Sequence, residues 1–181
     1  MKATGIVRRI DDLGRVVIPK EIRRTMRIRE GDPLEIYTDR EGEVIFKKYS
    51  PVGELATFAS QYAEALHKTC QLSIVITDRD NVIACAGVTK REYADRKLSR
   101  EFEEIIENRA FYNAGEGAKE DAVRVVEGAG AGVSCAMPII AEGDVTGAVA
   151  SLSSGEETAD KAVEEKLIRT AALFLGKQLE A

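Results

Sequence analysis

The sequence has few of the side chains on which metal sites and histidine-dependent catalysis rely. It contains one histidine, His67, and three cysteines, Cys70, Cys85 and Cys135, which are far apart and odd in number. That number and spacing argue against a disulfide framework and against CxxC-type zinc sites. We therefore expect no metal and no resident cofactor. His67 is expected to interact with the free carbonyls at a helix end.

Long apolar runs are also absent. No run approaches the roughly 20 residues that cross a bilayer, and the N-terminus lacks the apolar stretch of a secretory signal. We therefore expect a cytoplasmic protein, associated with the nucleoid if it binds DNA, and no membrane partner. The 181 residues allow one large domain or two small ones.

Charge is distributed unevenly along this acidic chain, whose net charge is −5. Residues 1–53 carry 12 Lys and Arg against 9 Asp and Glu, a net charge of +3. Residues 54–181 carry 14 against 22, a net charge of −8. Because one part is basic and the other acidic, the sequence predicts two domains with different kinds of partner.

The N-terminal part predicts a compact β-β-α-β-β unit. Alternation over residues 4–10 and the β-branched run at residues 15–18 predict two strands around a turn, and a short helix follows Pro19. Residues 34–38 and 43–48 predict a hairpin. A unit of about fifty residues buries little apolar surface by itself. The simplest way to bury the apolar side chains of its strands is to pair it with a second copy in a two-fold dimer.

Arginines are the basic side chains that recur along this unit: Arg8, Arg9, Arg15, Arg23 and Arg24. Residues 1–36 contain no aromatic side chain, so base stacking on a single strand is not expected. Guanidinium groups without aromatics suit the phosphates and guanine edges of duplex DNA. Taken alone, such arginines also suit a solvated strand edge and helix surface.

Ordered motifs favour DNA over a solvated edge. Residues 4–9 read TGIVRR, residues 14–24 read GRVVIPKEIRR, residues 34–37 read LEIY and residues 47–49 read KKY. This series resembles the AbrB/MazE family of swapped-hairpin DNA-binding domains. The resemblance implies an interleaved homodimer that contacts double-stranded DNA through Arg8, Arg15, Arg23 and Arg24, with Arg9 at a position that is usually basic.

Arg27 departs from that family, in which a glycine commonly closes the helix. A non-glycine residue costs up to roughly 1 kcal/mol if the backbone there must be left-handed. Either the helix ends differently here, or Arg27 adds a phosphate contact.

The remainder of the chain predicts an α+β domain. We place the DNA-binding and dimerisation domain at residues 1–50, a linker at 51–55 and the second domain at 56–181. Apolar spacing predicts helices over residues 54–68 and 100–109 and a last helix that ends near residue 179. Strands are predicted at residues 72–77, 82–86, 122–127, 133–140 and 146–152, which gives an antiparallel sheet with flanking helices.

Residues 137–152 (MPIIAEGDVTGAVASL) and 74–84 (IVITDRDNVIA) resemble the small-molecule sensor fold of GAF domains. The resemblance implies a pocket between the sheet and its covering loops, for which residues 87–98 and 111–119 are candidates. No residue dictates one ligand. Some GAF-fold enzymes are thiol-based methionine sulfoxide reductases, but their local cysteine pattern is not matched here, and we expect no enzyme.

The last helix carries two apolar stripes. One contains Val163, Leu167, Ala171 and Phe174, and the other contains Ile168, Ala172, Leu175 and Leu179. One stripe suffices to cover a sheet. The second either packs on the first helix of the same domain or meets another subunit, which would pair dimers into a homotetramer. The residues we assign to such oligomerisation are Leu55, Phe58, Tyr62, Ile168, Ala172, Leu175 and Leu179.

Together the two domains resemble a family of transcriptional regulators of spore-forming bacteria. We expect a sequence- or shape-selective DNA-binding regulator of sporulation genes whose GAF-like domain binds a small molecule or partner and tunes oligomer geometry. An antitoxin is one alternative, although about 128 patterned residues follow the N-terminal unit where antitoxins usually have a short tail. A thiol enzyme using Cys85 and Cys135 is the other.

Overall fold

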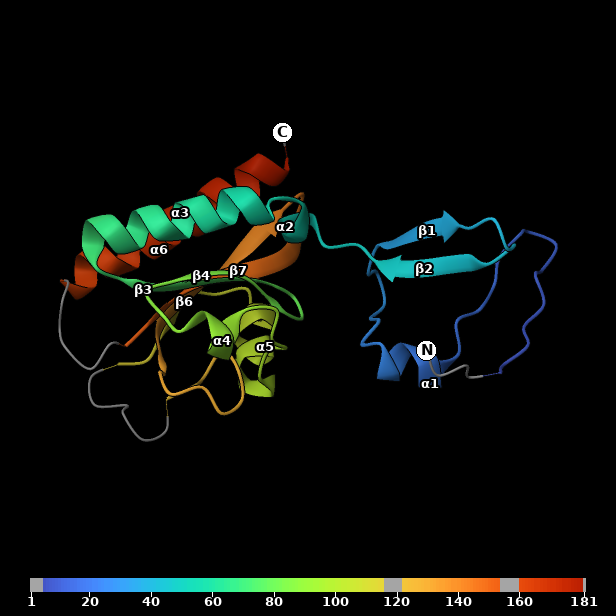
Figure 1. Ribbon diagram of the computed structural model, residues 1–181, viewed down its shortest axis with the longest axis horizontal. Coiled ribbons are helices and arrows are strands. Elements are labelled where there is room, and N and C mark those ends of the chain that lie inside the picture. The colour runs from blue at the N-terminus through green and yellow to red at the C-terminus, as the bar shows by residue number, and fades with distance from the viewer. Residues whose placement is uncertain (1–4, 116–121, 154–159, 181) are drawn as a thin grey trace. The chain divides into compact units, whose positions relative to one another are not determined.

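The computed structural model describes residues 5–115, 122–153 and 160–180. The chain divides into two compact units, Met1–Tyr49 and Ser50–Ala181 (Figure 1). None of the helices in the described residues combines the length and the apolar character needed to span a bilayer.

The N-terminal unit contains one helix and one hairpin. Helix α1 (Lys20–Thr25) follows Pro19, whose fixed φ suits the residue before a helix. Strands β1 (Leu34–Thr38) and β2 (Val44–Lys48) pair antiparallel from Leu34 opposite Lys48 to Thr38 opposite Val44. Their loop is held by Asp39, whose carboxylate accepts the backbone N–H groups of Glu41 and Glu43 at 3.0 and 2.8 Å. The hairpin is therefore as predicted.

Residues 5–10 and 15–19 form neither a helix nor a hydrogen-bonded ladder within the single chain that the structure describes. Several of their apolar side chains remain in solvent, with Val7 90%, Ile10 70% and Val17 69% exposed. A strand needs a neighbouring strand to satisfy its backbone groups, and in one copy of this unit β1 and β2 pair only with each other. The two predicted N-terminal strands are therefore not formed in the single chain.

Helix α1 ends in a left-handed turn at Arg27, where φ is 52°. The N–H of Ile28 donates to the carbonyl of Arg23 at 2.8 Å, and the N–H of Arg27 donates to that of Arg24 at 3.3 Å. These two bonds make a Schellman motif, in which glycine is the usual left-handed residue. The position that the sequence marked as unusual therefore does adopt the strained conformation.

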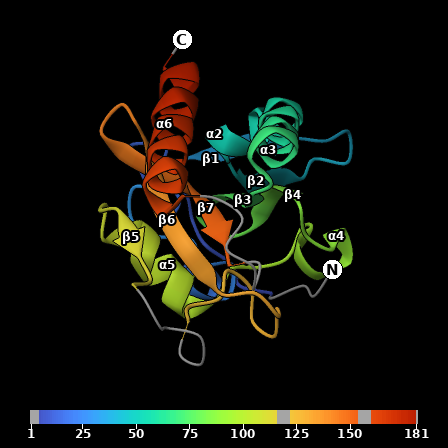
Figure 2. The same cartoon turned by 90° about the vertical axis from the view of Figure 1, so that its left-hand side faces the viewer.

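The C-terminal unit is built on a five-stranded antiparallel sheet in the order β4-β3-β7-β6-β5. Helices α2, α3 and α6 lie on one face of the sheet, and α4 and α5 lie on the other (Figures 1 and 2). This is the α+β architecture that the sequence predicts, an antiparallel sheet with flanking helices. The elements are α2 (Pro51–Glu54), α3 (Ala56–Cys70), β3 (Ser73–Asp78), β4 (Val82–Ala86), α4 (Lys90–Tyr93), α5 (Arg100–Glu107), β5 (Tyr112–Asn113), β6 (Val133–Ala141), β7 (Asp144–Leu152) and α6 (Lys161–Leu179).

Two segments differ from their predictions. Residues 122–127 form no strand; Val125 and Val126 are buried, so their apolar pattern reflects burial in an irregular segment. Residues 51–55, expected as a linker, contain helix α2. Ser50 caps this helix by accepting the N–H of Gly53 at 3.0 Å, and Val52 is buried in the core beneath α3 and α6. Because burial of Val52 favours order, this segment is structured.

Candidate functional site

The five arginines of interest all lie in the N-terminal unit. Arg8 and Arg9 are in the segment before the first turn, Arg15 directly follows that turn, and Arg23 and Arg24 are on α1. All five are exposed. Their guanidinium groups can therefore contact an anionic partner without a conformational change that exposes them.

The turn before Arg15 is organised by Asp11. Its carboxylate accepts the backbone N–H groups of Leu13 and Arg15 at 3.0 and 2.8 Å, and the Arg15 Nε at 2.8 Å. The Arg15 backbone N–H and then its guanidinium lower the pKa of the Asp11 carboxyl. An exposed ion pair contributes little stability. Its consequence here is orientation, because it restricts where the Arg15 side chain can point.

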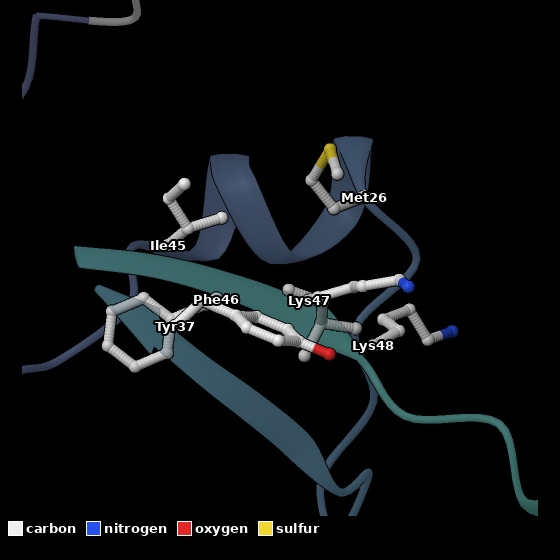
Figure 3. Close-up of a pocket in the computed structure, with 7 residues that line it drawn as sticks. Met26, Tyr37, Ile45, Phe46, Lys47 and Lys48 are labelled. Atoms are coloured by element: carbon white, nitrogen blue, oxygen red, sulfur yellow. The ribbon is translucent and has the colours of Figure 1, made fainter. Parts of the chain in front are cut away.

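A hollow of about 620 Å³ lies between the turn that follows α1 and the hairpin (Figure 3). Its lining is mostly apolar, and comprises Met26, Ile28, Tyr37, Ile45, Phe46, Lys47 and Lys48. Apolar walls of this kind suit the side chains of another polypeptide segment better than a charged ligand. Ile36, Val44 and Phe46 on the same hairpin are also exposed, 61%, 58% and 44% respectively.

The predicted oligomerisation residues of the C-terminal unit fall into two groups. Ile168, Ala172 and Leu175 are fully buried in the core cluster that joins α6 to the sheet. Their stripe covers the sheet of its own chain, so these side chains are not free to meet another subunit. The assignment of these three residues to oligomerisation is therefore corrected. Leu55, Phe58, Tyr62 and Leu179 are only partly buried.

An aromatic cluster occupies the surface between α3 and α6. The ring centroids of Phe58 and Tyr62 are 6.3 Å apart, and that of Phe174 lies 5.8 Å from Phe58 and 5.7 Å from Tyr62. Phe174 is 40% exposed, and its neighbour Leu173 is 67% exposed. Phe174 belongs to the stripe that the sequence analysis did not assign to oligomerisation, yet in the structure its side chain is partly exposed. The sequence shows two stripes but does not show which one faces the sheet.

The three cysteines are reduced. Cys135 packs in the cluster beneath α3 and α6, whereas Cys85 packs against the cluster on the α4 and α5 face. Burial, with a further contribution from the Glu164 and Glu165 carboxylates, raises the pKa of the Cys135 thiol to about 12. Burial also raises the pKa of the Cys85 thiol. Because the thiolate is the reactive form, these two sulfurs are poorly suited to shared thiol chemistry.

The buried hydroxyl of Thr77, on the α4 and α5 face, has no hydrogen-bond partner in the part of the chain that the structure describes. The Tyr93 hydroxyl lies on the same face; burial raises its pKa, and a hydrogen bond with the Ala131 backbone partly offsets that rise. Unpaired buried hydroxyls are costly unless water or a ligand pairs them. Tyr93 lies within residues 87–98, one predicted cover of a ligand pocket; of the other, residues 116–119 lie outside the described residues. No cluster of metal-binding side chains occurs among the described residues.

Two family models match the chain. Residues 54–180 match "Stage V sporulation protein T C-terminal, transcription factor", and residues 7–53 match "Antidote-toxin recognition MazE, bacterial antitoxin". Among solved structures, the N-terminal DNA recognition domain of the Bacillus subtilis transition-state regulator AbrB is 65% identical. It covers 28% of this chain and 94% of its own, with a TM-score of 0.24. A methyl-accepting chemotaxis protein fragment has a TM-score of 0.51 at 16% identity, covers 69% and 88%, and supports the fold alone.

Two relatives come from Bacillus subtilis (strain 168). The transition state regulatory protein AbrB is 44% identical over 101 residues, which cover 55% of this chain and 88% of AbrB. Stage V sporulation protein T is 50% identical over 182 residues, which cover 99% of both chains. With its two units matched in this way, the chain belongs to the stage V sporulation protein T family.

Proposed function

We propose that the protein is a DNA-binding transcription regulator of sporulation genes. The observation that carries this proposal is the set of exposed arginines on the N-terminal unit, at the positions that the AbrB/MazE motif assigns to DNA. The first 29 residues hold nine basic and three acidic side chains, a net charge of +6. Such a surface attracts duplex phosphates, whereas the acidic C-terminal unit is repelled by them.

Residues 1–50 act as a DNA-binding and dimerisation domain. The segments without a ladder, the exposed Val7 and Val17, and the apolar hollow at Met26 all support pairing with a second copy. A two-fold dimer would double the arginine set. Arg8, Arg15, Arg23 and Arg24 then contact double-stranded DNA, with Arg9 assisting.

Residues 56–181 act as a sensor and oligomerisation domain. The unpaired hydroxyl of Thr77 supports a small-molecule site on the α4 and α5 face, because a ligand could satisfy it. The aromatic cluster of Phe58, Tyr62 and Phe174, together with the partly buried Leu55 and Leu179, supports pairing of dimers into a homotetramer through the helices on the opposite face. The protein acts in the cytoplasm at the nucleoid.

Neither alternative explains the C-terminal unit as well. An antitoxin tail would be short, whereas this unit has a five-stranded sheet. A thiol enzyme would need reactive sulfurs, whereas Cys85 and Cys135 lie on opposite faces of that sheet with raised pKa values. We therefore assign no catalysis. The Cys85→Ser and Cys135→Ser variants should leave DNA binding intact.

A salt titration of duplex binding tests the DNA proposal. Each phosphate contact contributes roughly −0.9 to the slope of log affinity against log salt, so losing Arg23 from both protomers makes the slope shallower by about 1.8 and weakens binding roughly 60-fold at about 0.1 M salt. The measurement compares wild type with Arg23→Ala by fluorescence anisotropy on one labelled duplex.

Arg40→Ala is the matched control, because it removes one exposed positive charge from the hairpin loop rather than from α1. Its slope and affinity should equal those of wild type. A folded wild-type dimer that fails to bind duplex DNA even at low salt would overturn the proposed function, and the N-terminal unit would then serve protein partners only.

A further inference from the structure

Two loops of the N-terminal unit are built in the same way around an aspartate. Oδ1 of Asp11 accepts the backbone N–H groups two and four residues further on, at 3.0 and 2.8 Å, and the Asp11 N–H donates to the Arg15 carbonyl at 3.0 Å. Oδ1 of Asp39 accepts the corresponding N–H groups, also at 3.0 and 2.8 Å, and the Asp39 N–H donates to the Glu43 carbonyl at 3.2 Å. The two loops therefore share one set of backbone hydrogen bonds.

The loops differ in the side chain that follows the aspartate by four residues. This residue is Arg15 in the first loop and Glu43 in the second. In the first loop, the Arg15 Nε also donates to the second carboxylate oxygen of Asp11 at 2.8 Å. Because the Asp39 loop makes the same backbone bonds with a glutamate at that position, the turn does not require the guanidinium. The side-chain bond therefore orients the arginine and is not needed to form the turn.

The ion pair leaves the tip of the Arg15 guanidinium available. Asp11 contacts Nε, and the two Nη groups have no partner among the residues that the structure describes. The Arg15 side chain is 69% exposed. Its two Nη groups match the N7 and O6 acceptors of a guanine edge, and they also match two oxygens of a phosphate. The charge around the guanidinium distinguishes these two partners.

Arg15 differs from the other interface arginines in having its own carboxylate. Among the described residues, no carboxylate pairs with any of the other four: Arg8, Arg9, Arg23 and Arg24. The Asp11 carboxylate repels a phosphate at the Arg15 tip, whereas a guanine edge is uncharged. A neutral edge also gains from a guanidinium that is already oriented, because less conformational entropy is lost on binding. The ion pair therefore favours a base over a phosphate.

We propose that Asp11 is a positioning residue that directs Arg15 onto a guanine edge in the major groove of duplex DNA. Arg15 then supplies sequence selectivity, in contrast to the phosphate contact assigned to Arg23. This role rests on the proposed DNA-binding function.

The contact is tested on a duplex that wild type selects from a pool of random sequences. Each guanine of that duplex is then replaced in turn by 7-deazaguanine, which pairs normally but lacks the N7 acceptor. Wild type should lose roughly fivefold in affinity at one guanine of each half-site, because one of the two Arg15 hydrogen bonds is removed.

Asp11→Asn separates the positioning of Arg15 from the formation of the turn. The amide keeps an oxygen for the two backbone N–H groups but offers no second acceptor to the Arg15 Nε. Asp11→Asn should therefore bind the guanine and 7-deazaguanine duplexes equally, within about twofold. Asp39→Asn is the matched control, because it makes the same change of charge and acceptor in a loop without an arginine at that position. Asp39→Asn should keep the wild-type loss at that guanine.

The salt titration gives a second readout that a purely structural role would not change. Arg15→Ala should lose the discrimination between the two duplexes with a slope within about 0.5 of wild type, whereas Arg23→Ala makes the slope shallower by about 1.8. Three results would overturn the inference: a wild type that prefers no guanine, wild-type discrimination in Asp11→Asn, and a slope for Arg15→Ala as shallow as that for Arg23→Ala.

The outcomes distinguish this inference from the function on which it rests. If wild type binds and Arg23→Ala weakens binding while Asp11→Asn discriminates as wild type does, only the role of Asp11 fails. If wild type binds no duplex at low salt, the DNA-binding function fails and the role of Asp11 fails with it.

Discussion

Replacement of Gly147 by alanine is expected to lower the thermal unfolding midpoint of the protein by roughly 6–12 °C, which corresponds to about 3 kcal/mol of overpacking. Gly147 is buried in β7 between two strands, with Asp78 of β3 on one side and Ile139 of β6 on the other. A Cβ at this position would lie 1.9 Å from the carbonyl oxygen of Thr77 and 3.0 Å from the Cα of Asp78. Both are backbone atoms, so no rotamer change can relieve the clash.

The consequence reaches the end of β3. Separating β3 from β7 at Thr77 and Asp78 disturbs the β3–β4 turn, because Asp78 holds that turn through the N–H groups of Asp80 and Asn81 at 2.8 and 2.7 Å. The control is Gly130→Ala, at an exposed glycine where an added Cβ would meet nothing within 4 Å. Its stability should change by less than about 0.5 kcal/mol. Calorimetry on both full-length variants decides, and equal midpoints would show that β3 and β7 can separate cheaply.

In the N-terminal unit, local sequence motifs were enough to predict α1 and the β1–β2 hairpin. The two strands predicted before α1 depend on hydrogen bonds from another segment, so they do not form in the single chain. Pro19 before α1 and the Asp39 loop between β1 and β2 depend on neighbours in sequence, and both form as expected. Residues 5–10 have the alternation of a strand, yet their hydrogen bonds must come from another segment. The motif also identified the arginines, and the unusual residue at 27 lies where a glycine was expected.

In the C-terminal unit, periodicity identified the helices but could not assign their faces. Two apolar stripes on α6 differ by one position, and either could cover a sheet. The structure buries Ile168 and Leu175 against the sheet and leaves Phe174 beside Phe58. A strand is predicted over residues 122–127, although in the structure an irregular segment buries Val125 and Val126. The apolar pattern of residues 122–127 therefore indicates that side chains are buried, and it does not indicate that the backbone pairs in a sheet.

The second large expected effect is the conversion of a tetramer into a dimer by Phe174→Glu. In the single chain, the side chain at 174 is 40% exposed, so a carboxylate there can reach water and the fold should survive. In a tetramer joined through the aromatic cluster, the same carboxylate would be buried among rings without a partner, which is strongly unfavourable. The expected mass by light scattering falls from four times 19.8 kDa, about 79 kDa, to about 40 kDa.

Arg91→Glu is the control, because it places a new carboxylate on the exposed surface of α4, on the other face of the sheet, and should leave the mass unchanged. A Phe174→Glu protein that remains at the tetramer mass would show that the aromatic cluster is not part of the interface.

The dimer produced by Phe174→Glu retains a complete pair of N-terminal units. On a short duplex with one binding site, the slope of its log affinity against log salt should therefore equal that of wild type. On a longer duplex with two sites, it should lose the gain in affinity that linked binding faces provide. Such a split would assign DNA contact to the N-terminal units and the joining of two DNA sites to the helices of the C-terminal units.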